Sequence, residues 1–328
     1  MPANVETMMY VGEKPWHGLG RPVESAPNSK EAIKLAGLDW SVNMMPIYDS
    51  FGNVIPGYKV NTRSSDGKAL GVVTDKYRVV QNEDAFAFTD ELIGGDVHYV
   101  TAGSLSSGKR VWMLAQLPDR WMAEEKMENY LVFTNAHDGT GAIRVACTSI
   151  RVVCNNTLNL ALRRASRHWS CAHKGDIEYK LEEARDTLMN AQLYMEALEE
   201  EFGELKLKKV TEKQVNDMTD RLLQIEFNTL YNKAIKNANV VDLKGNLTYK
   251  KFEEKLNRKR NDILTIYHDK PDLRGTEHSA FRFVNAVSDY ATHTTDHKNT
   301  AHYQENLFMK TIDGNSLIDT AYKLALAS

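Results

Sequence analysis

Three hairpin signals follow one another in the first half of the chain, and they constrain its fold more than any other feature. Each one has two segments of alternating or apolar residues joined by a short turn rich in Gly, Ser and Asp. The paired segments are 57–63 with 69–73, 99–104 with 110–117, and 129–135 with 142–153. Such pairs predict antiparallel strands. Parallel strands would need a long crossover between successive segments, which the short turns exclude.

The pattern changes to helical spacing after Asn155 and Asn156, beginning with Leu158, Leu160 and Leu162. Beyond residue 175, apolar residues recur every three or four positions over long charged segments, which predicts amphipathic helices. The expected helices are 176–205, 211–237 with Thr211 as cap, 249–267, 279–293 and 313–327, with shorter ones at 30–36, capped by Ser29, and 83–92, opened by Asn82. We therefore predict an α+β fold, in which residues 1–175 form a hairpin-rich core packed with helices and residues 176–328 form a mostly helical region.

The composition is that of an ordinary globular protein, with 328 residues, 42% hydrophobic residues and a formal net charge of −3. The chain as a whole is therefore no polycation, and any attraction for nucleic acid must arise from local charge. Three cysteines, Cys147, Cys154 and Cys171, are too few for a disulfide framework and fit a reducing compartment. The N-terminus lacks a signal-peptide core, and no apolar run is long enough to span a bilayer. We expect a cytoplasmic protein with no membrane association.

The most informative stretch for function lies between Asp138 and Asp176, where the chain contains no acidic residue. Its cationic side chains are Arg144, Arg151, Arg163, Arg164, Arg167 and Lys174, accompanied by Trp169, His168 and His173. Phosphate backbones are bound by Lys and Arg, and neighbouring carboxylates would weaken that attraction. An aromatic ring can stack on an unpaired base. The stretch therefore predicts a surface that contacts single-stranded nucleic acid.

A second interpretation of the same charges stays open. Arg163, Arg164 and Arg167 have helical spacing near a helix C-terminus, where cations are favoured by the helix dipole, and they could also pair with the acidic helix that follows. In addition, Arg144 and Arg151 are separated by an odd number of positions, so a regular strand would direct them to opposite faces. Only one of these two can then contribute to a single basic surface.

Other groupings point only weakly to chemistry. His168, Cys171 and His173 lie close together in the sequence, but zinc needs about four ligands in compact pairs. No dinucleotide, phosphate-loop or nucleophile motif is present. His137 and Asp138, in the third hairpin loop, could serve a metal-dependent enzyme, which we keep as a third hypothesis. We assign no catalytic residue, no metal ligand and no cofactor.

Several stretches, taken together, resemble an uncharacterised family of phage and plasmid proteins that carries domain of unknown function 932. The matching stretches are Gly12–Gly20, Tyr77–Asn82, Thr101–Ser104, Thr134–Gly139, Ile150–Leu160 and Phe283–Tyr290. They occur in order over nearly the whole chain. The tail departs from the family pattern at His278-Ser279-Ala280-Phe281, which replaces a turn containing Trp.

The resemblance implies a mobile genetic element and therefore a bacterial cytoplasm, but it supplies no reaction. The order of hairpins followed by a helix is also similar to the core of phage single-strand annealing proteins, the lambda beta and RecT type, which form rings or filaments. We therefore expect a DNA-binding protein of replication or recombination that acts without a cofactor and oligomerises through its helical half. The residues expected to contact single-stranded DNA are Arg151, Arg163, Arg164, Arg167, Trp169 and Lys174. The alternative is a protein-interaction module, such as an inhibitor of a host defence protein, that binds through the acidic helix 176–204.

Overall fold

A computed structural model describes most of the chain, and every structural statement below concerns the residues that it describes. These are residues 5–12, 20–25, 28–93, 98–122, 124–151, 156–157, 168–177, 179–180, 183, 191–237, 244–270, 273, 276–294 and 315–328. The protein contains both sheets and helices, and the α+β prediction is confirmed.

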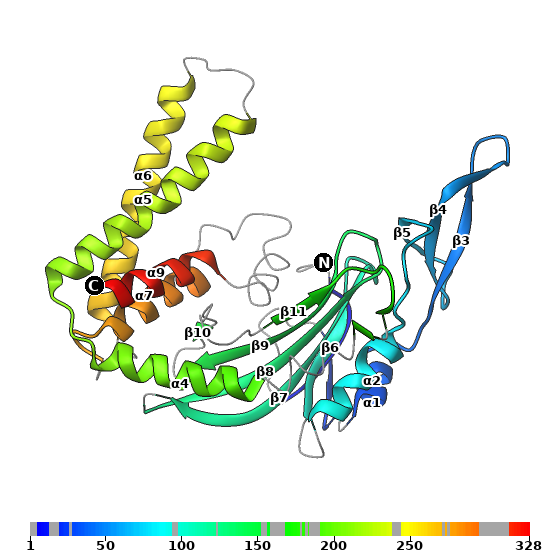
Figure 1. Cartoon of the computed structure of the whole chain (residues 1–328), viewed down its shortest axis with the longest axis horizontal. Helices are drawn as coiled ribbons and strands as arrows, with labels where there is room; N and C mark the ends of the chain where they lie inside the picture. The colour runs from blue at the N-terminus through cyan, green and yellow to red at the C-terminus, as the bar shows by residue number, and fades with distance from the viewer. Residues whose placement is uncertain are drawn as a thin grey trace.

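A large sheet forms the centre of the molecule, with strand order β10-β9-β8-β7-β6-β1-β2 and with β11 also paired to β9 (Figure 1). Its strands are β1 (Val5–Val11), β2 (Arg21–Val23), β6 (His98–Leu105), β7 (Arg110–Met122), β8 (Glu125–Ala136), β9 (Ile143–Arg151), β10 (Asn156–Thr157) and β11 (His168–Cys171). All neighbours are antiparallel except β1 and β2. The second and third predicted hairpins are therefore confirmed as β6–β7 and β8–β9.

A small sheet of three strands lies at one end of the large sheet and confirms the first predicted hairpin. It consists of β3 (Val42–Tyr48), β4 (Val54–Arg63) and β5 (Ala69–Thr74), in that order and all antiparallel. Figure 1 shows that β3 and β4 extend away from the rest of the molecule as a long hairpin. Only the base of this sheet can therefore pack against the large sheet.

The helices lie at both ends of the large sheet. Their bounds are α1 (Ser29–Leu35), α2 (Asn82–Ile93), α4 (Ala191–Leu207), α5 (Glu212–Asn237), α6 (Lys244–Asp269), α7 (Ala280–His293) and α9 (Ser316–Ala327). Figure 1 shows α1 and α2 below the small sheet, with the other helices at the opposite end, where α5 and α6 form a projecting helical hairpin. None of the helices within the described ranges is long and apolar enough to cross a membrane.

The helix ends follow from local hydrogen bonding, with one correction to the predictions. The Thr211 hydroxyl accepts a hydrogen bond from the Gln214 amide, as expected for the cap of α5. Ser29 was expected to cap α1, but the cap is Asn28, whose side chain accepts from the Glu31 amide. Ser29 instead donates from its hydroxyl to Asp90 of α2, at 2.6 Å. The carboxylate is a stronger acceptor, and it ties α1 to α2.

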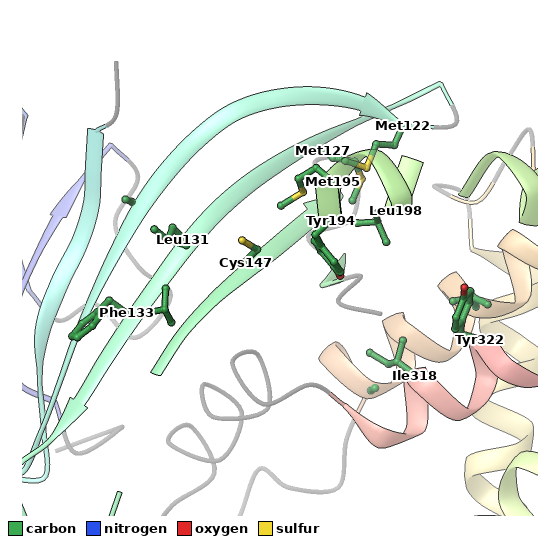
Figure 2. Close-up of a cluster of buried hydrophobic side chains, with 14 of the residues drawn as sticks. Met122, Met127, Leu131, Phe133, Cys147, Tyr194, Met195, Leu198, Ile318 and Tyr322 are labelled. Atoms are coloured by element: carbon green, nitrogen blue, oxygen red, sulfur yellow. The ribbon is translucent and has the colours of Figure 1, made fainter. Parts of the chain in front are cut away.

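One connected hydrophobic cluster joins the sheet to helices from both halves of the chain. Met122, Met127, Leu131 and Cys147 from the sheet belong to the same cluster as Tyr194, Met195 and Leu198 of α4 and Ile318 and Tyr322 of α9 (Figure 2). The hydrophobic core therefore runs across residue 175, where the pattern of the sequence changes. The predicted division into residues 1–175 and 176–328 stays a prediction.

Candidate nucleic-acid interface

The register of the large sheet separates two faces with different composition. Met113, Phe133 and Val145 are cross-strand neighbours, and all three belong to the main hydrophobic cluster. The next row consists of Trp112, Thr134, Arg144 and Ser170 from β7, β8, β9 and β11. Because side chains alternate along a strand, this row lies on the opposite face, which we call the second face. It combines an aromatic ring, hydroxyl groups and a cation.

A hollow of about 60 Å³ opens beside this row. Its lining residues are Leu105, Arg110, Val111, Trp112, Thr134, Asn135, Ala136, Thr140, Gly141, Ala142 and Arg144. Two are arginines, two are threonines and none is acidic. Arginine guanidinium and threonine hydroxyl groups are typical ligands of phosphate oxygens. The hollow therefore has the size and the chemistry to hold a phosphate group.

The floor of the hollow is fixed by Trp112. Its indole nitrogen donates to the Thr101 hydroxyl at 3.0 Å, and the ring covers Gly103 of the neighbouring strand. A Cβ built at Gly103 would lie 2.5 Å from the Trp112 ring, so only glycine allows the ring to lie there. The ring is buried, and it lines the hollow together with Arg110 and Arg144.

The rim of the hollow is the loop 137–141, which joins β8 to β9. The Asp138 carboxylate accepts from both the amide and the hydroxyl of Thr140, at 2.9 and 2.8 Å. Gly139 has φ of +78°, a left-handed conformation that favours glycine. Asp138 therefore shapes the loop and holds Thr140 at the rim.

On its other side, the same loop packs against the small sheet through a buried polar cluster, which we call the junction. The His137 side chain is completely buried, and its Nε2 lies 2.9 Å from Asn82 Oδ1. Asn82 donates from its own amide to the Leu38 carbonyl, so its oxygen must accept and His137 Nε2 must carry the proton. Asn61 of β4 donates to the His137 carbonyl at 2.8 Å. This chain of hydrogen bonds joins α2, the loop and the small sheet.

His173 forms the second half of the junction. Its ring stacks on Tyr77 with 4.5 Å between centroids, and its Nδ1 donates to the Arg78 carbonyl at 2.9 Å. Tyr77 in turn donates to the Ala136 carbonyl at 2.7 Å. Four buried atoms of the junction have no hydrogen-bond partner, and they are Asn61 Oδ1, Asn135 Oδ1, His137 Nδ1 and His173 Nε2. With the side chains oriented as above, all four are acceptors.

Burial controls the charge of the two histidines. Burial, with a smaller contribution from His173, lowers the pKa of His137 from 6.5 to about 3. Burial also lowers the pKa of His173, against the opposing effects of the Arg78 carbonyl and Asp138. Both rings are therefore neutral at physiological pH, since desolvation disfavours the charged form.

An ion-pair network borders the junction. The guanidinium of Arg63 binds Glu6 at 2.7 Å and Asp66 at 2.6 Å, and it lies over the Trp40 ring. Hydrogen bonds from Arg63 lower the pKa of both Glu6 and Asp66, to about 2 for Asp66. The charges of Arg63, Glu6 and Asp66 are therefore paired with one another, and these ion pairs stabilise the protein beside the junction.

The residues predicted to contact DNA differ in their position and in their burial. Arg163, Arg164 and Arg167 lie outside the described residues. Whether they bind DNA phosphates or pair with the acidic helix therefore stays a prediction. Trp169 is half-buried and packs against the main hydrophobic cluster, which reduces the ring surface that a base could reach. Lys174 is exposed, and its carbonyl accepts from Lys180 Nζ at 2.7 Å.

The strand register decides between the two arginines of β9. Arg144 pairs with Thr134 on the second face, whereas Arg151 pairs with Met127, which is completely buried in the main cluster. The two positions therefore lie on opposite faces, as their odd spacing predicts. Arg144 is the one beside the hollow, and it was not among the residues expected to contact DNA.

Arg110 is the residue of the hollow that the sequence did not single out. It follows the turn of the second hairpin, outside the acid-free stretch, and only the pairing of β7, β8 and β9 brings it near Arg144. His168 and His173 lie close together in the sequence but have different surroundings, because His168 is exposed while His173 is buried in the junction. Within the part of the chain that the structure describes, no three His, Cys, Asp or Glu residues are grouped to hold a metal ion.

A comparison with protein families gives one match, to a family model described as a domain of unknown function, DUF932, over residues 69–311. The matched range contains the hollow, the loop 137–141, both junction histidines and most of the helical region. No curated protein and no solved structure matches the chain.

Proposed function

This chain belongs to the DUF932 family, and from that premise we propose that it is a DNA-binding protein that holds single strands by their phosphate backbone. The proposal includes a role in the replication or recombination of a phage or plasmid, of the single-strand annealing kind. Annealing requires only that strands are held extended and can exchange partners, so it needs no cofactor and no nucleotide hydrolysis.

The observation that carries the proposal is the hollow between Arg110 and Arg144. Two arginines and two threonines line it without any carboxylate, although the chain as a whole has a net charge of −3. A local excess of positive charge on an acidic protein is the pattern expected of a backbone-binding surface. We place one phosphate in the hollow, beside the guanidinium groups of Arg110 and Arg144.

The acid-free stretch extends this surface in the proposal. Arg144 lies on β9, and β11 pairs with the same strand, so the start and end of the stretch lie side by side in the sheet. Arg163, Arg164, Arg167 and Lys174 would bind the phosphates that follow along the strand. Trp169 is half-buried against the main hydrophobic cluster, and Arg151 pairs with Met127 instead of with the row that contains Arg144, so the proposal does not depend on either residue.

The test is the salt dependence of binding to a fluorescently labelled oligonucleotide. We expect wild-type affinity to fall steeply with salt, and the double change Arg110→Gln with Arg144→Gln to weaken binding by roughly tenfold or more, since a charge-assisted hydrogen bond contributes about 1.5–3 kcal/mol. Each lost phosphate contact should also reduce the salt slope by roughly 0.7 for single strands.

The matched control is Arg258→Gln, which removes the same charge from an exposed position on the projecting α6. It should leave both affinity and salt slope unchanged. Thermal unfolding of each variant checks that the fold is intact. Binding that is absent from the wild type at low salt, or that is the same in the double variant and the control, would rule out this function.

A second candidate is a protein-interaction module, favoured by the acidic surface of α4. Glu196, Glu199, Glu200 and Glu204 are all exposed on this helix. Recovery of one specific host protein from a nuclease-treated lysate, lost when these four residues are changed to Gln, would favour this function over DNA binding.

A further inference from the structure

The strand that separates Arg110 from Arg144 carries small side chains at this end of the large sheet. Arg110 of β7 pairs with Ala136 of β8, and Arg144 of β9 pairs with Thr134, two positions earlier on β8. Side chains two positions apart on a strand point to the same face, so all four residues share the second face. Since neighbouring strands lie about 4.8 Å apart, the Cα atoms of the two arginines are about 12 Å from each other.

Trp112 lies in the same row as Thr134 but is turned away from β8. Its ring contacts Gly103, and its indole nitrogen donates to the Thr101 hydroxyl, and both of these residues belong to β6. The ring therefore bounds the hollow on the side of β6. The space over β8, between the two arginines, is left to the small side chains of Thr134 and Ala136.

The size of the hollow selects a small chemical group. A buried water needs roughly 10–15 Å³ of such space, so the hollow of about 60 Å³ admits roughly four to six water-sized groups, the bulk of one tetrahedral phosphate. Pockets that hold whole small molecules measure roughly 300–1,000 Å³. A sugar or a base is therefore too large to enter, and only the phosphate of a nucleotide fits.

The walls of the hollow favour a phosphate at the end of a strand over one in its interior. Leu105 lines the hollow on the side of β6, and Thr140, Gly141 and Ala142 line it just before β9, so the lining comes from two opposite sides. An internal phosphate is joined to two sugars, and both of its ester oxygens have to lead out between these walls. A terminal phosphate is joined to one sugar and can insert its three other oxygens.

The charge of the lining favours the same ligand. A phosphate monoester carries about −1.5 to −2 charges at pH 7, more than the single charge of an internal diester. Among the residues that the structure describes, two arginines and no carboxylate line the hollow. The carboxylate of Asp138 accepts from the amide and the hydroxyl of Thr140. Each guanidinium can donate two parallel hydrogen bonds to phosphate oxygens, so the pair matches a dianion with three free oxygens.

We propose, on the basis of the proposed DNA-binding function, that the hollow binds the terminal phosphate monoester of a DNA strand. Arg110 and Arg144 hold its three free oxygens from opposite sides, and the first sugar lies outside the hollow. The cations of the acid-free stretch then bind the internal phosphates that follow. A 5′ end and a 3′ end share this chemistry, and experiment distinguishes them.

The test compares oligothymidines of equal length that carry a 5′-phosphate, a 3′-phosphate or hydroxyl groups only at their ends. Each one displaces an internally labelled strand from the full-length protein, and fluorescence anisotropy gives its affinity. We expect a terminal phosphate, at one end or at both, to raise the affinity about tenfold, the effect of one charge-assisted hydrogen bond. Methylation of that phosphate to a diester, which removes one charge, should abolish most of the gain.

Two variants connect the gain to the hollow. Arg110→Gln with Arg144→Gln should remove it, so that phosphorylated and hydroxyl ends bind equally. Ala142→Leu keeps both arginines but adds bulk to the lining of the hollow, and it should also remove the gain. Arg258→Gln, on the exposed surface of α6, is the control and should keep the gain in full. Thermal unfolding confirms that each variant is folded, and Ala142→Leu decides the outcome if the double variant is not.

Equal affinity of the wild type for phosphorylated and hydroxyl ends would overturn the inference. If the arginine variants still weaken binding in that case, the hollow holds an internal phosphate and the DNA-binding function stands. A gain that persists in both hollow variants would overturn the inference as well, because the strand end would then bind elsewhere. Failure of every oligonucleotide to bind would instead remove the DNA-binding function, and the terminal-phosphate site with it.

Discussion

The two faces of the small sheet differ in how far their side chains are covered. The inner face combines buried apolar residues, Val42 and Val73, with Asn61 and Arg63, which are buried and bonded to the junction and to Glu6. The outer face presents Met45 and Val72 to solvent. A half-buried antiparallel sheet normally places apolar residues inside and polar residues outside. The comparison teaches that the small sheet is held to the protein by buried hydrogen bonds as well as by apolar contacts, and that an apolar side chain can lie on either face.

The two faces also differ in what their residues contribute to stability. A hydrogen bond in the junction contributes only about 1 kcal/mol net, but a buried group that loses its partner costs about 1–3 kcal/mol. An apolar residue on the outer face contributes little to the stability of one chain, because it remains in water. Substitutions on the inner face should therefore change the free energy of unfolding, whereas those on the outer face should leave it nearly unchanged.

The largest effect is expected where the inner face meets the loop. A Cβ built at Gly71 would lie 2.5 Å from the Asp138 carbonyl oxygen, a backbone atom that cannot move alone. Gly71→Val should lower the free energy of unfolding by about 3 kcal/mol, as severe overpacking does. Urea unfolding measures it. Gly203→Ala is the control, since nothing lies within 4 Å of a Cβ there, and this change should stabilise α4 by up to about 1 kcal/mol.

A slightly smaller effect is expected from Asn82→Ala. The change leaves the His137 Nε2 proton and the Leu38 carbonyl without their partner inside the protein. We expect a loss of roughly 2–3 kcal/mol in the free energy of unfolding. Asn43→Ala, on the exposed outer face, is the matched control and should change stability by less than about 0.5 kcal/mol. Equal losses from both changes would contradict the assignment of the faces.

Acid should weaken the junction. The pKa of His137 is about 3 in the folded protein and 6.5 without the fold, so the unfolded chain takes up a proton first as the pH falls. The stabilisation is fully present above pH 6.5 and is lost progressively from there toward pH 3. Between pH 7.5 and pH 5 we expect a loss of about 2 kcal/mol from this residue, with a further loss from His173.

Urea unfolding across that pH range measures the acid effect. His137→Gln retains an amide donor but cannot titrate, and its stability should depend less on pH, by about one proton. Asn43→Ala removes no titratable group and should keep the wild-type pH dependence. A wild type with the same stability at pH 7.5 and pH 5 would show that the junction histidines are not buried as described.

The smallest effect on folding, and the sharpest test of the comparison, comes from two neighbouring positions of β5. Val72 is exposed on the outer face, and Val73 is 5% exposed on the inner face. Val72→Thr should change the stability of the dilute protein by less than about 0.5 kcal/mol. Val73→Thr buries a hydroxyl and should cost about 1–3 kcal/mol. The reverse ranking would mean that the two faces are assigned the wrong way round.

Local pattern was enough to predict the three hairpins, α2 and most of the described helices, because each of these depends on neighbours in sequence. The strands β1, β3 and β11 were not predicted. Pro46 interrupts β3, and β11 is only four residues long, His168–Cys171. Such segments become strands because a partner strand is available to bond them, and a partner distant in the chain leaves no local signal.

The same distinction applies to the candidate site residues: local pattern placed some of them, and others depended on partners distant in the chain. The odd spacing of Arg144 and Arg151 placed them correctly on opposite faces, since alternation is a property of any regular strand. Nothing local indicated that Arg110 would lie beside Arg144, because three strands have to pair first. His173 was considered with His168 and Cys171 as a possible zinc ligand, but it packs on Tyr77, nearly a hundred positions earlier in the chain.

The sequence by itself determined that this chain is an α+β protein with antiparallel hairpins, and it marked one acid-free stretch, because periodicity and charge are written along the chain. Only the tertiary structure decided which face of the small sheet is buried. That choice depends on the loop 137–141 meeting β5, and on the buried hydrogen bonds that then hold Asn61 and His137. A strand with polar and apolar sides can be packed on either one, and the partner selects the side.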